Sequence, residues 1–354
     1  MSRRTSSRSC SAGTRRSTSA GPRGLPPPSP RRAASSSAVS GAGSDLDPRA
    51  LYRAEVGGIE TRYYAAGDAA QPRLVLVHGG QYGSYYSLDS WDTVLRPLQQ
   101  RFRLFAPDRP GQGHSAAPGA PGGYRWEAGE RHIERFLEEV VRGPAHLVGH
   151  SRGALLVCRL ALRRPDLAMT LVLVDAGSLA PEDPAYPRSE RFYERLPAPP
   201  PGEAGAAAVR IEPEAQSLSQ AHLSDDFVGR LVAIARRPEV LRARREMAER
   251  GSSLFQPGLE RARAEALQAI GERGLPVPTL ILWGAQDPST PALAGERLWD
   301  LVRRRTELSE LRFIEGAGHY CFREQPAAFV SEVVDFLGSA RDGAGGHGTL
   351  RGSG

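Results

Sequence analysis

The chain has no lysine, no asparagine and only three cysteines in 354 residues. All 46 basic residues are therefore arginine, a bias that we attribute to the coding sequence rather than to chemistry. Cys10, Cys158 and Cys321 show neither metal-ligand spacing nor a disulfide framework, which favours a reducing compartment such as the cytoplasm. No stretch approaches the roughly 18 apolar residues of a spanning helix, so we expect no membrane partner.

The formal charge of +6 comes from one end of the chain. Residues 1–48 hold eight arginines against two aspartates, so the remainder is neutral. A neutral domain offers no net cationic field to phosphate backbones, and we expect no nucleic-acid partner. Residues 1–48 are also rich in Ser, Pro and Gly, which predicts a disordered tail that is either dispensable or a targeting signal.

From residue 49 onward, short apolar runs alternate with segments of helical period. Expected strands cover residues 54–59, 62–66, 74–77, 104–106, 146–148, 171–174, 279–282 and 311–314. Expected helices cover residues 91–100, 126–142, 152–164, 291–305 and 326–338. Continuous apolar runs are typical of strands buried on both faces, so the pattern predicts a doubly wound α/β domain with a mostly parallel sheet.

One long interval breaks this alternation. Residues 178–275 contain helical stretches but no strand-like run, which predicts a helical cap inserted between two strands. We expect helices near 186–195, 224–236, 239–250 and 258–271, with a flexible connector at 197–205. The core then comprises residues 49–177 and 276–340, followed by a flexible tail at 341–354.

A serine lies where a strand passes directly into a helix. Gly149-His150-Ser151-Arg152-Gly153 follows the apolar run 145–148 and precedes the helix-forming run 154–164. Such a turn strains the serine backbone, and glycines two positions to either side let the strand and helix approach each other. This context predicts that Ser151 is a nucleophile.

Two further residues supply what a reactive serine requires. A serine hydroxyl needs a histidine base, and the base needs an acid that fixes its tautomer. Asp287 and His319 follow consecutive strands, and the carboxyl ends of parallel strands meet at one edge of a sheet. We therefore predict His319 as base and Asp287 as acid, with Asp175, after the strand at 171–174, as the alternative acid.

Backbone amides are the expected donors to the oxyanion of the attacked carbonyl. One is the amide of Arg152, directly after the serine, and the other lies in the glycine-rich loop after residue 77. We favour the amide of Gly80, with that of Gln81 as the near alternative. His78 and His150 are expected to be structural, whereas His222 could face either the substrate or the surface.

From about residue 51 to 340 the chain resembles the α/β-hydrolase superfamily. Five blocks carry the resemblance in the family order: Val77-His78-Gly79-Gly80, Asp108-Arg109-Pro110-Gly111-Gln112-Gly113-His114-Ser115, Gly149-His150-Ser151-Arg152-Gly153, Trp283-Gly284-Ala285-Gln286-Asp287 and Gly316-Ala317-Gly318-His319. The resemblance implies the α/β-hydrolase fold and a cofactor-free, metal-free serine hydrolase with the triad Ser151, Asp287 and His319.

The same resemblance narrows the chemistry. Haloalkane dehalogenases and epoxide hydrolases have aspartate where this chain has Ser151. Hydrolases of ring-cleavage products resemble one another in an active-site asparagine and a tryptophan after the catalytic histidine, whereas this chain lacks asparagine and has Tyr320. We therefore expect cleavage of a small or medium ester, thioester or lactone. The alternatives are carbon–carbon hydrolysis and noncatalytic ligand binding, and a homo-oligomer stays open.

Overall fold

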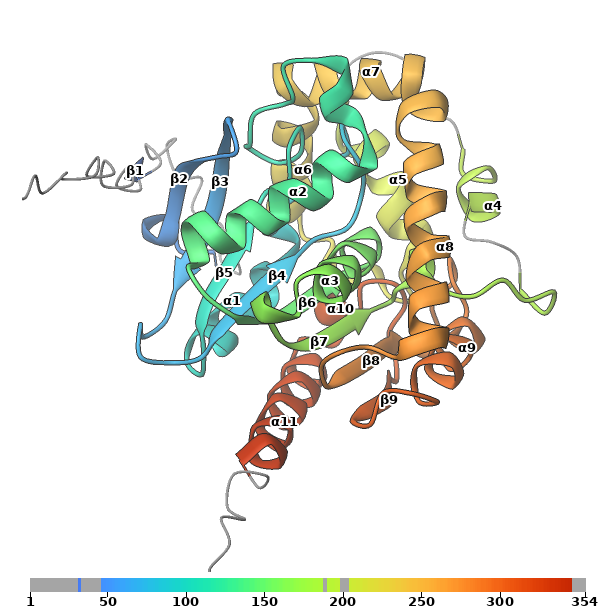
Figure 1. Ribbon diagram of the computed structural model, residues 1–354. Coiled ribbons are helices and arrows are strands. Elements are labelled where there is room, and N and C mark those ends of the chain that lie inside the picture. Colours follow the sequence, from blue (N-terminus) through green and yellow to red (C-terminus); the bar gives the residue numbers. More distant parts are fainter. Residues whose placement is uncertain (1–30, 33–45, 187–189, 198–203, 346–354) are drawn as a thin grey trace, which may run out of the picture.

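The computed structural model describes residues 31–32, 46–186, 190–197 and 204–345, and these form a nine-stranded sheet in the order β1-β2-β3-β5-β4-β6-β7-β8-β9 (Figure 1). The strands are β1 (Arg31–Arg32), β2 (Leu51–Val56), β3 (Ile59–Ala66), β4 (Arg73–Val77), β5 (Arg103–Pro107), β6 (Ala145–His150), β7 (Ala168–Val174), β8 (Thr279–Gly284) and β9 (Ser309–Ile314). Neighbours from β5 to β9 in this order are parallel, whereas β1, β2, β3 and β5 pair antiparallel.

Two details at the amino end differ from the sequence-based expectation. The hairpin turn between β2 and β3 lies at Gly57 and Gly58, both with positive φ, and so falls inside the predicted strand 54–59. These glycines supply the left-handed backbone that a two-residue hairpin requires. Arg31–Arg32, inside the predicted tail, pairs with β2, and most of the rest of that tail lies outside the described residues.

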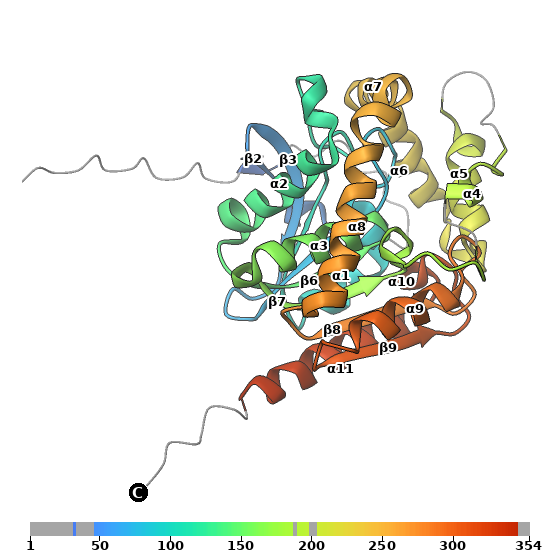
Figure 2. The same cartoon turned by 45° about the vertical axis from the view of Figure 1, so that its right-hand side comes forward.

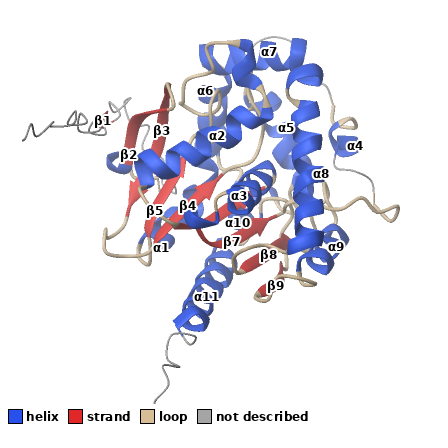
Figure 3. Ribbon diagram, in the orientation of Figure 1, coloured by secondary structure: helices blue, strands red, loops and turns tan. Residues whose placement is uncertain are grey.

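Helices cover both faces of the sheet, as Figure 3 shows. One core lies on the face of the sheet to which the Val75 side chain belongs. It contains residues of α2 (Trp126–Phe136), α3 (Arg152–Arg163) and α9 (Ala292–Val302). The other core joins α1 (Asp92–Gln99) and α11 (Pro326–Gly345) to the opposite side, for example Leu74. Because successive strand residues face opposite sides, continuous apolar strands are required, and the predicted doubly wound fold is confirmed.

The interval between β7 and β8 is helical, as expected. It contains α4 (Glu190–Tyr193), α5 (Ala206–Gln216), α6 (Asp225–Ala235), α7 (Pro238–Leu254) and α8 (Gln256–Arg273). α8 also packs on α3 and contributes Ala266 and Ile270 to the main core, and Figure 2 shows it running alongside α3. None of the described helices combines the length and apolar content that crossing a bilayer needs.

The sequence analysis missed α5. Pro213 inside it reads as a helix break, and its three leading alanines give no amphipathic period. Its buried residues are Val209, Pro213 and Gln216, and Val209 joins a small separate core with Phe227 and Leu231 of α6. Tertiary packing on α6 therefore stabilises a helix that local pattern does not predict.

The passage from β6 into α3 depends on two close backbone contacts. A Cβ on Gly149 would collide with the backbone of Gly153, and one on Gly153 would collide with the backbone of Val77. Backbone atoms cannot turn aside as a flexible side chain can, so both positions require glycine.

We expect Gly149→Ala to destabilise the protein by about 1–3 kcal/mol, because its methyl group would push α3 away from β6. Thermal unfolding should show a lowered midpoint. Gly229→Ala is the matched control, because nothing lies within 4 Å of the added carbon in α6 and alanine favours a helix. Equal midpoints for Gly149→Ala and the original protein would contradict this account.

Candidate active site

Ser151 occupies the predicted strained turn. Its backbone has φ 53° and ψ −121°, a conformation that non-glycine residues rarely adopt. The Ser151 amide donates to the carbonyl of Val174 at 2.9 Å, and its carbonyl accepts from Ala154 N and from Ser178 Oγ. The surrounding bonds thus hold the serine in a conformation that costs free energy, as is common at functional sites.

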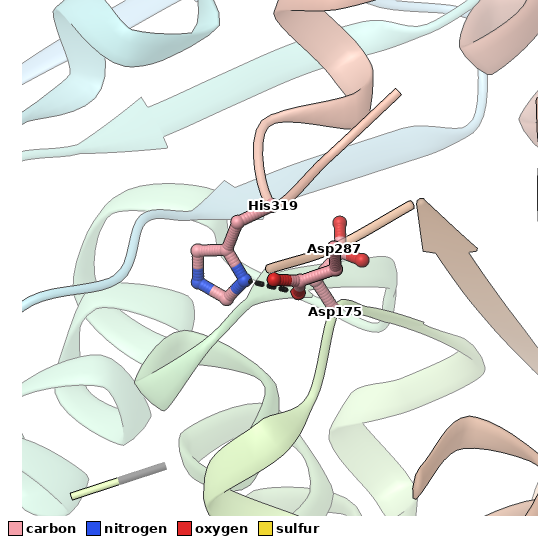
Figure 4. A group of neighbouring side chains, drawn as sticks. All are labelled: Asp175, Asp287 and His319. Carbon is pink, nitrogen blue, oxygen red and sulfur yellow. Dashed lines mark hydrogen bonds and ion pairs between the residues drawn. The ribbon is translucent and has the colours of Figure 1, made fainter. Parts of the chain in front are cut away.

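His319 and Asp287 lie against each other at the carboxyl edge of the sheet (Figure 4). His319 Nδ1 donates to Asp287 Oδ2 at 2.7 Å, and both side chains are buried. The other oxygen of Asp287 accepts from the amide and hydroxyl of Ser289 and from the amide of Thr290. The carboxylate is therefore fixed, and the His319 Nε2 atom is left as the acceptor that a general base needs.

Asp175, the alternative acid, has a different partner. Its Oδ1 atom accepts from the amide of Gly284 at 2.7 Å, while its Oδ2 atom has no hydrogen-bond partner among the described residues. Burial, and then the neighbouring charge of Asp287, raise the pKa of Asp175 well above its usual value. The structure thus brings His319 to Asp287, and Asp175 is a buried neighbour that favours the protonated form.

The three groups also make up the one set among the described side chains with metal-ligand spacing. Ligand atoms of Asp175, Asp287 and His319 lie within 4.8 Å of one another. However, Asp287 already accepts four hydrogen bonds, one of them from His319 Nδ1. These hydrogen bonds fit an acid–base pair better than a metal site, because a metal ion would have to displace the groups that donate to Asp287.

The charge of Asp287 also determines how His319 titrates. Burial by itself would lower the pKa of His319, but the charge of Asp287 and its hydrogen bond outweigh burial and raise the pKa above the usual 6.5. An imidazolium is thus stabilised at the position where proton abstraction from a serine would create one.

The loop after β4 approaches Ser151 closely. A Cβ on Gly79 would lie 3.0 Å from the Cβ of Ser151, and Gly80 has φ 79°. The Arg109 guanidinium donates to the carbonyls of Gly80 at 2.9 Å and Gly79 at 3.2 Å. Holding these carbonyls fixes the peptide planes, and with them the direction of the amides that we predicted as oxyanion donors. Sequence analysis assigned no role to Arg109, although it lies in a motif block.

The two histidines expected to be structural have structural partners. His78 Nδ1 donates to the Gly79 carbonyl at 2.9 Å and Nε2 accepts from the Arg109 amide at 3.1 Å, while burial, and then Arg109, lower the pKa of His78 to about 3. His150 Nε2 donates to the carbonyl of His319 at 2.9 Å. Both rings therefore position loops.

His222, which the sequence left undecided, has partners within the protein. It shares a hydrogen bond with Ser217 Oγ at 2.8 Å and accepts from Arg323 Nε at 3.3 Å. Burial, and then the charge of Arg323, lower the pKa of His222 to about 3. Both of its ring nitrogens are engaged within the protein, and His222 does not line the cavity beside Ser151.

Ser151 and His319 line a common cavity of about 650 Å³. No hydrogen bond joins Ser151 Oγ to His319 Nε2 in the described part of the chain, and such bonds are often long before substrate binds. Tyr193 and Leu259, from the inserted helical segment, also line this cavity. Phe227, Leu231 and Phe255 are instead buried in cores, and Leu218 is exposed.

A set of hydrogen bonds that sequence reasoning missed fastens α5 to the histidine loop. The His319 amide donates to the carbonyl of Gln216 at 2.9 Å. The carboxylate of Glu324 accepts from the amides of Gly318, at 2.9 Å, and of Leu218 and Ser219, both at 2.8 Å. Nothing in the sequence signals these contacts, because they depend on an unpredicted helix and on backbone donors. They make the cap part of the support of His319.

Comparison with known proteins agrees with this fold. The model of the alpha/beta hydrolase fold family matches residues 72–326, and the chain belongs to this family. A meta-cleavage product hydrolase from Pseudomonas fluorescens has a TM-score of 0.64 at 22% identity, covering 81% of this chain and 97% of that one. The protein is thus an α/β-hydrolase, as the sequence resemblance implied.

Two curated relatives have named activities. An esterase of Mycobacterium tuberculosis is 27% identical over 75% of this chain and 83% of its own length. A 2-hydroxy-6-oxo-2,4-heptadienoate hydrolase of Pseudomonas putida is 28% identical over 79% of this chain and 94% of its own length. The relatives thus differ among themselves in the substrate that their names give.

We expect Asp287→Asn to reduce kcat by about 10³–10⁴-fold, because the amide favours the wrong imidazole tautomer. Only neutral His319 can accept a proton, so kcat/KM should rise with pH through the pKa of His319, above 6.5 in the original protein. Without the Asp287 charge, burial lowers that pKa, and the acid limb should move to lower pH. A pH profile of residual activity checks this shift, and an acid limb at unchanged or higher pH would contradict it.

We expect Glu324→Gln to reduce kcat by about ten- to hundredfold with a smaller change in KM, because the amide group cannot accept all three backbone donors and the His319 loop shifts. Steady-state kinetics measure the split, and amide hydrogen exchange at residues 318–319 should accelerate. Glu332→Gln is the control, since Glu332 pairs with Arg312 away from the site. Similar kinetics for both variants would argue against a positioning role.

Proposed function

We propose that the protein is a serine hydrolase that cleaves a small or medium carboxylic ester, thioester or lactone through an acyl-enzyme. The observation that carries the proposal is the buried bond from His319 Nδ1 to Asp287 at 2.7 Å, beside a cavity that Ser151 also lines. That bond leaves Nε2 as the only basic nitrogen of the imidazole, on the side away from Asp287.

The proposed reaction proceeds in two halves. Ser151 Oγ attacks the carbonyl carbon while His319 Nε2 takes its proton, and the amides of Gly80 and Arg152 donate to the oxyanion. His319 then gives the proton to the leaving alcohol or thiol. A water molecule, deprotonated by His319, attacks the acyl-enzyme and releases the acid. Asp287 stays ionised throughout and stabilises the imidazolium.

Carbon–carbon hydrolysis is the second candidate, because relatives include a 2-hydroxy-6-oxo-2,4-heptadienoate hydrolase. We rank it lower because the chain has no asparagine and has Tyr320 directly after His319. Tyr320 is buried, and its hydroxyl donates to Gln216 Oε1 at 2.8 Å and shares a hydrogen bond with Tyr86 Oη at 2.5 Å. The position after the histidine is therefore committed to an internal polar network.

The proposal includes an organisation and a setting for the chain. We propose a core of residues 49–177 and 276–340 and a cap of residues 178–275, with a small-molecule substrate as the partner and the cytoplasm as the location. Three cysteines and a neutral folded part support this setting. The two cysteines in the described part of the chain, Cys158 and Cys321, are free and buried.

We expect a fluorophosphonate probe to label Ser151 covalently, because it reacts with serines that a histidine base activates. Peptide mapping by mass spectrometry locates the label. Ser151→Ala should abolish both labelling and hydrolysis of short p-nitrophenyl esters, whereas Asp175→Asn should have a mild effect because Asp175 does not bond to His319.

Four results would count against the proposal. Folded protein that takes no label, or label that persists in Ser151→Ala, would remove the nucleophile. Ester turnover that survives the loss of Ser151 would favour a noncatalytic binding protein instead. Faster turnover of a 2-hydroxy-6-oxo-dienoate than of any ester would favour the carbon–carbon reaction.

A further inference from the structure

The cavity beside Ser151 is lined by charged residues of both signs. Four arginines reach it, namely Arg152, Arg191, Arg195 and Arg263, together with the acids Glu182, Asp183 and Glu260. Four cations against three anions leave only a small formal excess of positive charge on the wall. The ion pairs that the individual side chains form therefore decide which charge remains available to a substrate.

The acids on this wall are largely neutralised within the protein. Asp183 pairs with Arg297, outside the lining, at 2.6 Å. Glu182 lies 3.6 Å from Arg263, which also donates to the carbonyl of Ala180. Glu260 accepts from the side-chain amide of Gln256 at 3.2 Å and is the remaining acid.

Three of the arginines have no comparable partner. The guanidinium groups of Arg152, Arg191 and Arg195 make no hydrogen bond or ion pair within the described ranges. With Glu260 as the one acid not matched to a cation, the wall has an excess of positive charge. Arg230 on α6, by contrast, is held by Asp92 and Asp226 and is not available to a ligand.

Of the three arginines, Arg152 is the one next to Ser151 in the chain. It is the first residue of α3, directly after Ser151, and its side chain is only partly exposed. The amino end of this 12-residue helix adds a partial positive charge at the same place. The nearby acid Glu212 on α5 feels the charge of Arg152, but burial raises its pKa, which weakens any neutralisation of Arg152. A cation is thus kept beside the reacting serine.

We propose that the substrate carries a carboxylate, which Arg152, Arg191 and Arg195 bind while Ser151 attacks the ester or thioester carbonyl. The inference rests on the proposed hydrolase function and names its substrate class. Guanidinium groups bind carboxylates through two parallel N–H···O bonds, so this wall would orient the substrate as well as attract it. Arg191 belongs to α4 and Arg195 lies just beyond it, so this part of the inserted segment takes part in the selection.

The test compares matched esters that differ in one charge. The first pair is the p-nitrophenyl ester of glutarate with a free carboxylate and the same ester with that carboxylate methylated. The second pair is 4-(butyryloxy)benzoate and its methyl ester. In the first of these two compounds, the charge lies on the leaving phenol rather than on the acyl group. In at least one pair, kcat/KM should be about ten- to hundredfold higher for the anion, as expected for charge-assisted bonds.

The double variant Arg191→Gln/Arg195→Gln should lose about tenfold of that preference, measured as the ratio of kcat/KM for the anionic ester to kcat/KM for its methylated partner. Free glutarate should inhibit the double variant less than the original protein. The matched control is Arg245→Gln/Arg250→Gln, which removes two exposed arginines of α7 that do not line the cavity and should keep the preference.

The outcomes distinguish a failure of the carboxylate site from a failure of the hydrolase function. Hydrolysis of neutral and anionic esters at equal kcat/KM in both pairs overturns the carboxylate site and leaves the serine hydrolase standing. An equal loss in the control double variant also overturns the site, because overall charge would then explain the preference. If no ester is cleaved and Ser151 takes no label, the hydrolase function fails, and the carboxylate site fails with it.

Discussion

The hydrogen bond from His319 to Asp287 is the interaction on which the proposed chemistry of this protein depends. It joins the loops after β9 and β8, so it exists only because parallel strands bring their carboxyl ends to one edge. Both partners are buried, and a buried charge is tolerated only when its hydrogen bonds are satisfied. Ser289 and Thr290 supply those bonds to Asp287, which holds the carboxylate against His319 Nδ1 and so fixes the orientation of the imidazole.

A second set of buried charges holds the surroundings of this pair in place. Arg62 on β3 bonds to Asp89 at 2.8 Å and to Asp108 at 2.5 Å, and Asp108 also accepts from the amides of Leu88 and His114. Removing one partner of such a group leaves a buried charge uncompensated, which costs more than the pair contributes when intact. These ion pairs therefore act mainly as positional constraints on β3 and on the loops that contain Asp89 and Asp108, the second of which also carries Arg109.

Asp92 extends this arrangement to the cap. It accepts from Arg323, after the histidine loop, and from Arg230 of α6. The ring of Phe227 lies under the Arg323 guanidinium at 3.5 Å, so a cap side chain packs directly on that cation. Because α6 and the histidine loop share one carboxylate, the cap cannot move far without exchanging charged partners. Together with the hydrogen bonds of Glu324, these contacts couple the position of the cap to the position of His319.

The sequence predicts those features that rest on local pattern. Continuous apolar runs located the strands of the parallel sheet, and strand order then placed Ser151, Asp287 and His319 at one edge. Features that depend on contacts between distant segments were not predictable. α5 contains Pro213 and packs on α6. Gln216 acts through its backbone carbonyl, and Glu324 accepts from backbone amides, so the partner group in each contact is one that any residue type could provide. The charge of the cavity wall was also hidden, because only the pairing of each arginine shows which charges remain.

The same reasoning explains why family membership leaves the substrate open. The groups that form the acid–base pair come from the sheet, whereas Tyr193, Arg191 and Arg195 come from the inserted helices. These two parts meet at Gln216, whose backbone holds His319 and whose side chain bonds to Tyr193 and Tyr320. A change in the cap therefore alters the cavity wall and the support of the base together. The turn at Ser151 and its glycines, by contrast, are fixed by backbone contacts with α3 and β4 and do not involve this junction.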